Sequence, residues 1–79
     1  MTVIFPGTKF ILHLREEYTP GTKVRLIEMP DDPLPIEPGT VGEVKGVDDA
    51  GHIMVKWENG RGLNLIPGID HFEKVGKHD

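Results

Sequence analysis

The sequence contains no cysteine and no serine, and both absences limit its chemistry. Without cysteine, neither a disulfide framework nor a thiolate metal site can stabilise the fold, and such a composition fits a reducing cytoplasm, where we expect the protein. No side-chain nucleophile with an adjacent base can be identified, and no threonine lies in a nucleophile elbow. Phosphate-binding loops and dinucleotide-binding motifs are missing as well. We therefore predict a protein that is not an enzyme and needs no cofactor.

Long apolar runs and a surplus of basic residues are also missing. No apolar stretch approaches the roughly 20 residues that span a bilayer, so we expect no membrane segment. The first residues, MTVIFPGTKFILHLREE, have no basic stretch before their apolar part, which argues against a secretory signal. The net charge is −4. This charge argues against non-specific nucleic-acid binding as the main role, but it leaves room for a local basic face.

The chain has 79 residues, a length that fits one domain. A domain of this size buries only about 60% of the surface that its unfolded chain exposes, so its stability margin is small. We predict a single domain over residues 1–79, with an N-terminal helical or extended segment at 1–19, a β-rich body at 20–75 and a frayed tail at 76–79.

Three Pro-Gly-Thr triplets begin at Pro6, Pro20 and Pro38. Proline fixes φ at the first turn position and glycine accepts a positive φ at the second, so each triplet predicts a tight turn. After the second triplet, the alternation over residues 23–26 predicts a half-buried strand. After the third, residues 40–47 predict another strand.

The segment between these two predicted strands, MPDDPLPIEP at residues 29–38, contains four prolines. Because proline cannot donate a ladder hydrogen bond, this segment predicts a loop and excludes a central strand. In the strand that follows, Gly42 and Gly46 flank Val44. Glycines at such positions indicate a bulge or a close backbone approach, as strongly curved sheets require.

The second half of the chain predicts hairpins. Residues 48–51, Asp-Asp-Ala-Gly, predict a turn, and residues 52–58 then alternate as a strand. Asn59-Gly60 predicts a type I′ turn, which needs a positive φ twice, and Leu63 and Leu65 continue the inward face beyond it.

The closing part of the chain is expected to be short. Pro67-Gly68 ends the return segment, and residues 71–75 predict one more strand. Four or five short strands at this spacing are typical of a small barrel or a strongly bent sheet.

The N-terminal segment leaves two alternatives open. Phe10, Ile11, Leu14 and Tyr18 share one helical face, while Phe10, Leu12 and Leu14 also alternate as in a strand. The charged residues 15–17 favour a helix. Thr8 is a candidate cap at its start, and Thr19-Pro20 is expected to end it.

Several motifs resemble a known family when taken in order: PGTKVRL, PGTVGEV, GVDDAG, VKWENG and LIPGID, all from Pro20 onward. They resemble a small uncharacterised family from bacteria and phages, catalogued as a domain of unknown function. LREEY, at residues 14–18, is similar to the end of that family's short helix. The resemblance implies no catalytic or binding residues.

More loosely, the pattern from Gly42 to Trp57 is similar to KOW-type and other SH3-like barrels, which implies a fold but not a function. We therefore predict a mostly β fold, a small SH3-like antiparallel barrel of four to five strands with a short N-terminal helix.

The sequence has four histidines: His13, His52, His71 and His78. None of their spacings is that of a zinc site, so we predict no metal site and expect ordinary surface or partly packed histidines. The acidic residues Asp31-Asp32 with Glu37, and Asp48-Asp49, lack the ligand pattern of an EF-hand loop. They favour turns, with weak cation binding as the alternative, and Asp70 is expected to cap a local turn.

Trp57 has two interpretations. Its alternation with Ile53 and Val55 predicts burial inside the barrel. The alternative is an exposed anchor on the hairpin, because tryptophan is enriched at interaction hot spots.

The outward face of the predicted sheet carries a candidate binding surface made of Lys23, Arg25, Lys45 and Lys56, with Arg61 extending it at the hairpin tip. One interpretation is an ordinary solvated face mixed with Glu43 and Glu58. The alternative is a basic surface that contacts phosphates or an acidic protein.

Together these features predict a non-enzymatic protein-interaction module whose partner is a protein not identified by the sequence. Its candidate surfaces are the loop from Pro30 to Pro38 and the hairpin from Trp57 to Arg61. The alternative function is nucleic-acid binding through the basic face. The resemblance implies a phage or mobile-element accessory protein, an adaptor or inhibitor of a host complex. Monomer and homodimer both stay open, because an edge strand needs covering.

Overall fold

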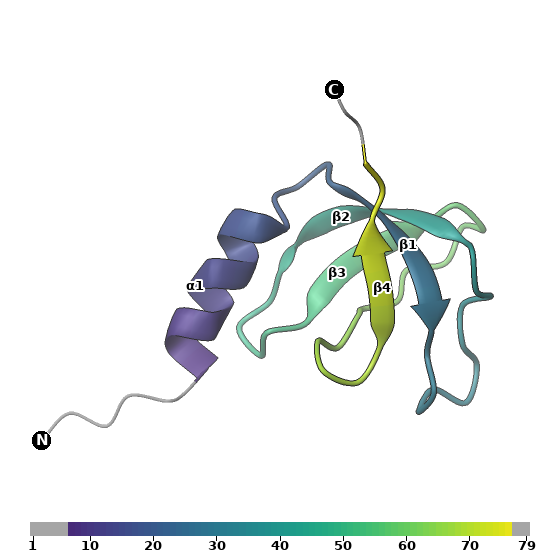
Figure 1. The fold of residues 1–79 in the computed structure, drawn as a ribbon, viewed down its shortest axis with the longest axis horizontal. Coiled ribbons are helices and arrows are strands. Elements are labelled where there is room, and N and C mark those ends of the chain that lie inside the picture. The colour runs from purple at the N-terminus through teal and green to yellow at the C-terminus, as the bar shows by residue number, and fades with distance from the viewer. Residues whose placement is uncertain (1–6, 77–79) are drawn as a thin grey trace, which may run out of the picture.

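The computed structural model describes residues 7–76 of the chain. Helix α1 (Gly7–Glu17) precedes four strands, which are β1 (Lys23–Glu28), β2 (Val41–Val47), β3 (Ile53–Trp57) and β4 (His71–Lys74). The strands form one antiparallel sheet in the order β3-β2-β1-β4 (Figure 1). The predicted mostly β fold with a short N-terminal helix is therefore confirmed, and the extended alternative for the N-terminal segment is wrong. In the described part of the chain, no helix has the length and apolar character that crossing a membrane requires.

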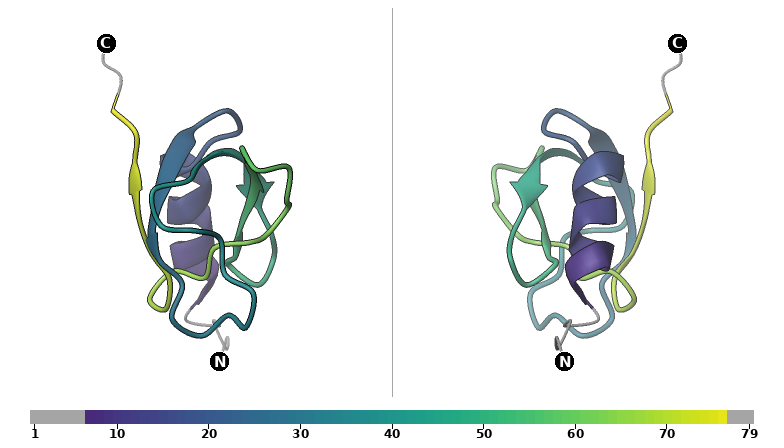
Figure 2. Two further views of the ribbon diagram at one scale, coloured as in Figure 1. Left: turned by 90° about the vertical axis from the view of Figure 1, so that its right-hand side faces the viewer. Right: turned by 90° about the vertical axis from the view of Figure 1, so that its left-hand side faces the viewer.

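The sheet bends around its interior, so that β4 and β1 lie on one side and β3 lies on the other (Figure 2). Residues 61–65 run back along β3 as an irregular fifth segment. Ile53 and Leu65 exchange both backbone hydrogen bonds, at 2.9 and 2.8 Å, and the Leu63 amide donates to the Val55 carbonyl at 3.2 Å. Within residues 7–76 no strand ladder joins this segment to β4, so the sheet is curled like a barrel but is not closed by hydrogen bonds.

Two of the predicted Pro-Gly-Thr corners are tight turns. Gly21 and Gly39 have φ values of 96° and 92°. The Thr22 amide donates to the Thr19 carbonyl at 3.0 Å, and the Thr40 amide donates to the Glu37 carbonyl at 3.1 Å. The first predicted corner begins at Pro6, which lies outside the described residues.

Helix α1 begins at Gly7, so Thr8 lies inside the helix and is not the cap that the sequence suggested. Its inward side chains are Leu14, which is buried, and Ile11, which is partly buried, and Tyr18 just after the helix also packs against the core. Hydrogen bonds from Arg15 connect the helix to the end of β2. Its Nε and Nη2 atoms donate to the Val47 carbonyl at 3.2 and 3.1 Å, and Nη2 also meets Asp49 Oδ1 at 2.9 Å.

The turn after β3 differs from the predicted type I′ turn. Gly60 has a φ of 91°, but no non-glycine residue of the described chain has a positive φ, so Asn59 does not. The turn uses three residues, 58–60, because the Trp57 amide donates to the Arg61 carbonyl at 2.8 Å. Asn59 Oδ1 accepts from the Arg61 amide at 3.0 Å and stabilises this wider turn. A type I turn followed by a left-handed glycine satisfies the same Asn-Gly sequence.

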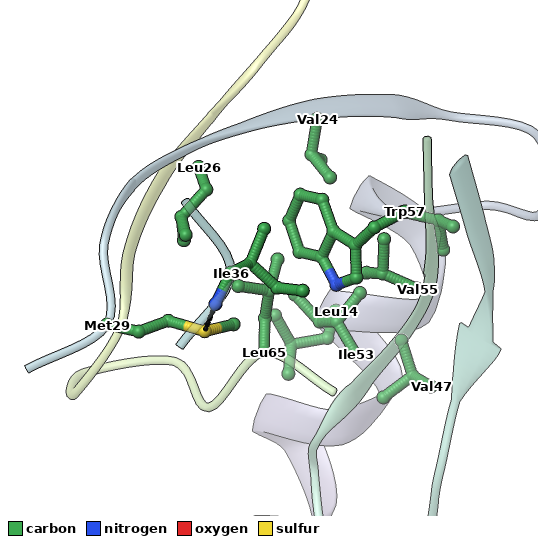
Figure 3. Close-up of a cluster of buried hydrophobic side chains, with 11 residues drawn as sticks. Leu14, Val24, Leu26, Met29, Ile36, Val47, Ile53, Val55, Trp57 and Leu65 are labelled. Atoms are coloured by element: carbon green, nitrogen blue, oxygen red, sulfur yellow. Dashed lines mark hydrogen bonds between the residues drawn. The ribbon is translucent and has the colours of Figure 1, made fainter. Parts of the chain in front are cut away.

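The core gathers side chains from every element, and Figure 3 shows the cluster around Trp57. Alternation correctly predicted the inward residues of the strands. Two further core residues come from the Pro-rich segment and were not predicted. Ile36 is 0% exposed and Met29 is buried beside it, and the Ile36 amide donates to Met29 Sδ at 3.4 Å.

Trp57 lies at the centre of this core and is 1% exposed. Its Nε1 donates to the Leu63 carbonyl at 2.9 Å, which satisfies the one polar atom of the indole. The interpretation of Trp57 as an exposed binding anchor is therefore wrong, and the alternative of burial is confirmed.

Gly42 lies opposite Trp57 in the register of β2 and β3. A Cβ atom at Gly42 would overlap Val55 Cγ1 and would lie 2.7 Å from Trp57 Cε3. Gly46 marks a shift in the register between Val44 and Gly46. The prediction of a close backbone approach and a bulge at these two glycines is confirmed.

Replacing Trp57 with alanine removes the largest side chain of the core together with its hydrogen bond. We expect Trp57→Ala to lower the free energy of unfolding by about 3–5 kcal/mol, measured by chemical denaturation. The matched control is Met54→Ala on the outward face of the same strand, with an expected change within about 0.5 kcal/mol. Equal losses in both variants would contradict the burial of Trp57.

Adding a methyl group at Gly42 forces the strands apart at the Trp57 contact. We expect Gly42→Ala to cost about 1–3 kcal/mol and to cost less in a Val55→Ala background, because the nearest obstructing atom is then gone. Gly62→Ala is the control, since a Cβ there meets no atom within 4 Å. A double-mutant cycle of unfolding free energies measures the coupling, and a coupling of zero would refute the close approach.

Candidate functional site

The outward faces of β1, β2 and β3 bring the predicted basic residues together. Lys23 pairs in register with Glu43, which pairs in turn with Lys56, so the three side chains form one row across three strands. Lys45 lies two residues further along β2, and Arg25 lies two residues further along β1. The sequence correctly placed these four basic residues on one face.

Carboxylates neutralise much of this face. Glu43 forms two ion pairs: Oε1 lies 3.5 Å from Lys23 Nζ, and Oε2 lies 3.4 Å from Lys45 Nζ. Arg25 Nη1 meets Glu73 Oε2 at 3.0 Å. Each of these pairs is exposed and adds little to stability. Their consequence is electrostatic, because a ligand phosphate would have to compete with carboxylates already in place.

The pKa of Glu43 reports this surrounding charge. The charge of Lys45 and its hydrogen bond lower the pKa of Glu43 from its ordinary value of 4.5, and Lys23 lowers it further. Glu43 therefore stays ionised to lower pH in the folded protein than in the unfolded chain.

The side chain of Arg61 extends toward the Pro-rich loop and not along the face that carries the other four basic residues. Its Nη1 donates to the Pro35 carbonyl at 3.3 Å. The hairpin tip is thereby joined to the Pro-rich loop, residues 30–38. The two surfaces that the sequence predicted as separate candidates are adjacent in the structure.

The Pro-rich loop is fixed at several points along its length. Ile36 is inserted into the core, and Asp32 Oδ1 accepts from the Leu34 amide at 2.9 Å. Near its end, the Gly39 amide donates to the Leu26 carbonyl at 2.7 Å. These contacts leave little freedom to the backbone between them.

The side chain of Leu34 projects from this fixed loop into solvent. It is 71% exposed and is the most exposed large hydrophobic side chain of the described residues. The sequence identified the loop as a candidate surface but missed this residue, since Leu34 and Ile36 both stand between prolines or beside them. Periodicity could not separate the inward side chain from the outward one.

A groove lies between the Pro-rich loop and the turn that precedes β4. Its volume is about 270 Å³, and its lining residues are Asp31, Asp32, Pro33, Asn64, Ile66, Ile69 and Asp70. The Ile66 amide donates to Asp70 Oδ2 at 2.8 Å, which confirms the expected turn cap. The sequence did not predict that the acidic residues of the loop and Asp70 meet at one groove.

A second hollow, of about 390 Å³, lies where β1 begins and β4 ends. Its two charged side chains already have partners. Lys23 meets Glu43, and Lys74 Nζ meets Glu17 Oε1 at 3.2 Å and lies 5.0 Å from the centre of the Tyr18 ring. This hollow therefore offers no free charged group to a ligand.

The acidic pair after β2 forms a turn, as predicted. Asp48 Oδ1 accepts from the amides of Ala50 at 3.0 Å and His52 at 2.8 Å. These hydrogen bonds lower the pKa of Asp48 from its ordinary value of 3.8, and the one from His52 contributes most. In the part of the chain that the structure describes, no three His, Asp or Glu side chains converge as metal ligands would.

The lowered pKa of Glu43 has a consequence for stability at acidic pH. Between the folded and unfolded pKa values the unfolded chain binds more protons, so the contribution of Glu43 to stability is fully present above about pH 4.5 and is lost as the pH falls through the folded value. We expect Glu43→Gln to reduce the slope of unfolding free energy against pH below about 4.5. Glu58→Gln on the neighbouring turn is the control, and equal slopes in the two variants would contradict this.

A family model described as "Domain of unknown function (DUF4314)" matches residues 7–75, which include α1 and all four strands. No curated protein matches the chain. The predicted resemblance to an uncharacterised small-domain family is confirmed, while its ordered motifs and the likeness to KOW-type barrels stay predictions. The chain belongs to the DUF4314 family, a domain of unknown function.

Proposed function

We propose that this domain is a non-enzymatic protein-interaction module and that the Pro-rich loop, residues 30–38, is its contact surface. The observation that carries the proposal is Leu34, a large apolar side chain that is 71% exposed on a loop fixed from both sides. Contiguous exposed apolar surface is typical of contact sites. Leu34 directly follows Pro33, which lines one groove together with Ile66 and the 40% exposed Ile69.

The fixed backbone favours binding. Association costs free energy whenever a loop or a side chain must be ordered, and a loop ordered in advance avoids part of that cost. Ile36 and Arg61 hold the loop from two directions, from the core and from the hairpin tip. The hairpin thus contributes through Arg61 and its contact with Pro35, and the buried Trp57 acts only by shaping the core.

Nucleic-acid binding is the second candidate function. The observation in its favour is that Lys23, Arg25, Lys45 and Lys56 lie on one outward face of three neighbouring strands. Two features weigh against it. Glu43 and Glu73 already pair with three of these residues, and Trp57, which could have stacked on bases, is buried.

The proposal includes a biological setting. A bacterial or phage source, a cytoplasmic location and an accessory role as an adaptor or inhibitor of a host complex follow from the resemblance and the composition alone. They are compatible with a domain that presents one fixed contact surface and no recognisable catalytic group.

The two functions predict opposite outcomes for two variants. We expect Leu34→Ser to reduce retention of a protein partner from native lysate by about tenfold or more, as loss of an anchor does. We expect the fourfold variant K23A/R25A/K45A/K56A to retain that partner, also after nuclease treatment.

The opposite pattern would contradict the proposal. Retention that survives Leu34→Ser and is lost in the fourfold variant or on nuclease treatment would assign the function to the basic face. Fluorescence anisotropy with single-stranded and duplex DNA then measures the salt dependence, which is steep for phosphate contacts. Circular dichroism of each variant verifies that the sheet is intact.

A further inference from the structure

We propose that the groove between the Pro-rich loop and the turn before β4 binds a segment of a partner protein that carries arginine or lysine beside a large apolar side chain. This inference rests on the proposed function and adds the place of docking and the chemistry of the partner.

Apolar side chains from both sides of the chain line the groove. Pro33 comes from the Pro-rich loop, and Ile66 and Ile69 come from the turn before β4. Ile69 is 40% exposed, and the exposed Leu34 directly follows Pro33 in the chain. An apolar side chain placed here would remove apolar surface of these residues from water, which favours binding at about 25 cal/mol per Å² of apolar area.

The charge of the groove is negative, and within the described residues no cationic side chain compensates it by an ion pair. Asp31, Asp32 and Asp70 line it, and none of them forms an ion pair with any cationic group of residues 7–76. The cation joined to the loop, Arg61, donates to the Pro35 carbonyl. This differs from the outward face of the sheet, where Glu43 and Glu73 already have basic partners.

Backbone hydrogen bonds hold two of these carboxylates in place. Asp32 Oδ1 accepts from the Leu34 amide at 2.9 Å, and Asp70 Oδ2 accepts from the Ile66 amide at 2.8 Å. The second oxygen of each carboxylate is left for an incoming donor. Guanidinium and ammonium groups suit such oxygens, and charge-assisted hydrogen bonds are about twice as strong as neutral ones.

A metal ion does not fit the same groove. No three acidic or histidine side chains of the described residues converge closely enough to hold one. The carboxylates are spread along a groove of about 270 Å³ that also has apolar walls. Such a surface matches a side chain with a cationic head and an apolar neighbour, and not a compact ion.

The test uses the full chain and two synthetic peptides of equal length, one alternating arginine and leucine and one alternating glutamate and leucine. We expect saturable amide shifts in NMR spectra at Asp31, Asp32, Asn64 and Ile69 with the basic peptide only. In the D31N/D32N variant the affinity should fall about fivefold or more and its salt dependence should flatten. The asparagine at position 32 keeps the oxygen that accepts from Leu34.

The control variant E16Q/E58Q also removes two negative charges, but from exposed sites outside the groove lining. We expect it to bind the basic peptide as the wild type does. Shifts elsewhere on the molecule, equal shifts with both peptides, no shifts at all, or equal losses in the two variants would each overturn the inference.

The same variants separate this inference from the proposed function. If Leu34→Ser loses the protein partner from lysate while D31N/D32N retains it, the interaction module stands and the acidic groove does not. If Leu34→Ser retains the partner, the loop itself is not the contact surface and both conclusions fail.

Discussion

The contact between the indole of Trp57 and the bare Cα of Gly42 determines how this sheet curves. A side chain at Gly42 would overlap Val55 and Trp57, so only glycine lets β2 lie this close to the ring. The same indole donates to the Leu63 carbonyl and draws the return segment, residues 61–65, against β3. One packed ring therefore supports both the bend of the sheet and the segment that covers its edge.

The position of the Pro-rich loop follows from this core. Ile36 fills space within the buried cluster, next to Met29, although both lie between the strands and not in them (Figure 3). Ile36 is inside, while Leu34, two residues earlier on the same loop, is 71% exposed. The contact surface that we propose is thus a product of core packing, and its rigidity is the rigidity of the core.

The charges of the surface fall into two groups with different consequences. On the outward face, lysine and arginine side chains surround Glu43 and Glu73, which leaves a mixed surface of the kind that keeps a small domain soluble. In the groove beside Leu34, three aspartates have no ion-pair partner among the described residues. The uncompensated aspartates thus lie next to Leu34, the most exposed large apolar side chain of the described residues.

Much of the fold was predictable because strands with one buried face alternate with period two. The inward positions of β1, β2 and β3, the Pro-Gly corners and the close approach at Gly42 all follow from that period and from turn chemistry. The turn at Asn59 was mispredicted because two turn types accept the same Asn-Gly pair.

The candidate site was less predictable because it depends on contacts between segments far apart in the chain. Neither the burial of Ile36 nor the direction of Arg61 toward Pro35 leaves a local pattern in the sequence. The groove is similar in this respect, since its walls meet only after the loop and the turn before β4 have packed.

The central claim is that the Pro-rich loop is an ordered extension of the core that holds Leu34 in solvent. Amide hydrogen exchange of the full chain tests it most directly. We predict that the amides of Ile36 and Gly39, which donate to Met29 Sδ and to the Leu26 carbonyl, exchange as slowly as those of β1 and β2. Exchange of these two amides at the rate of an unstructured peptide, while the strands stay protected, would contradict the claim.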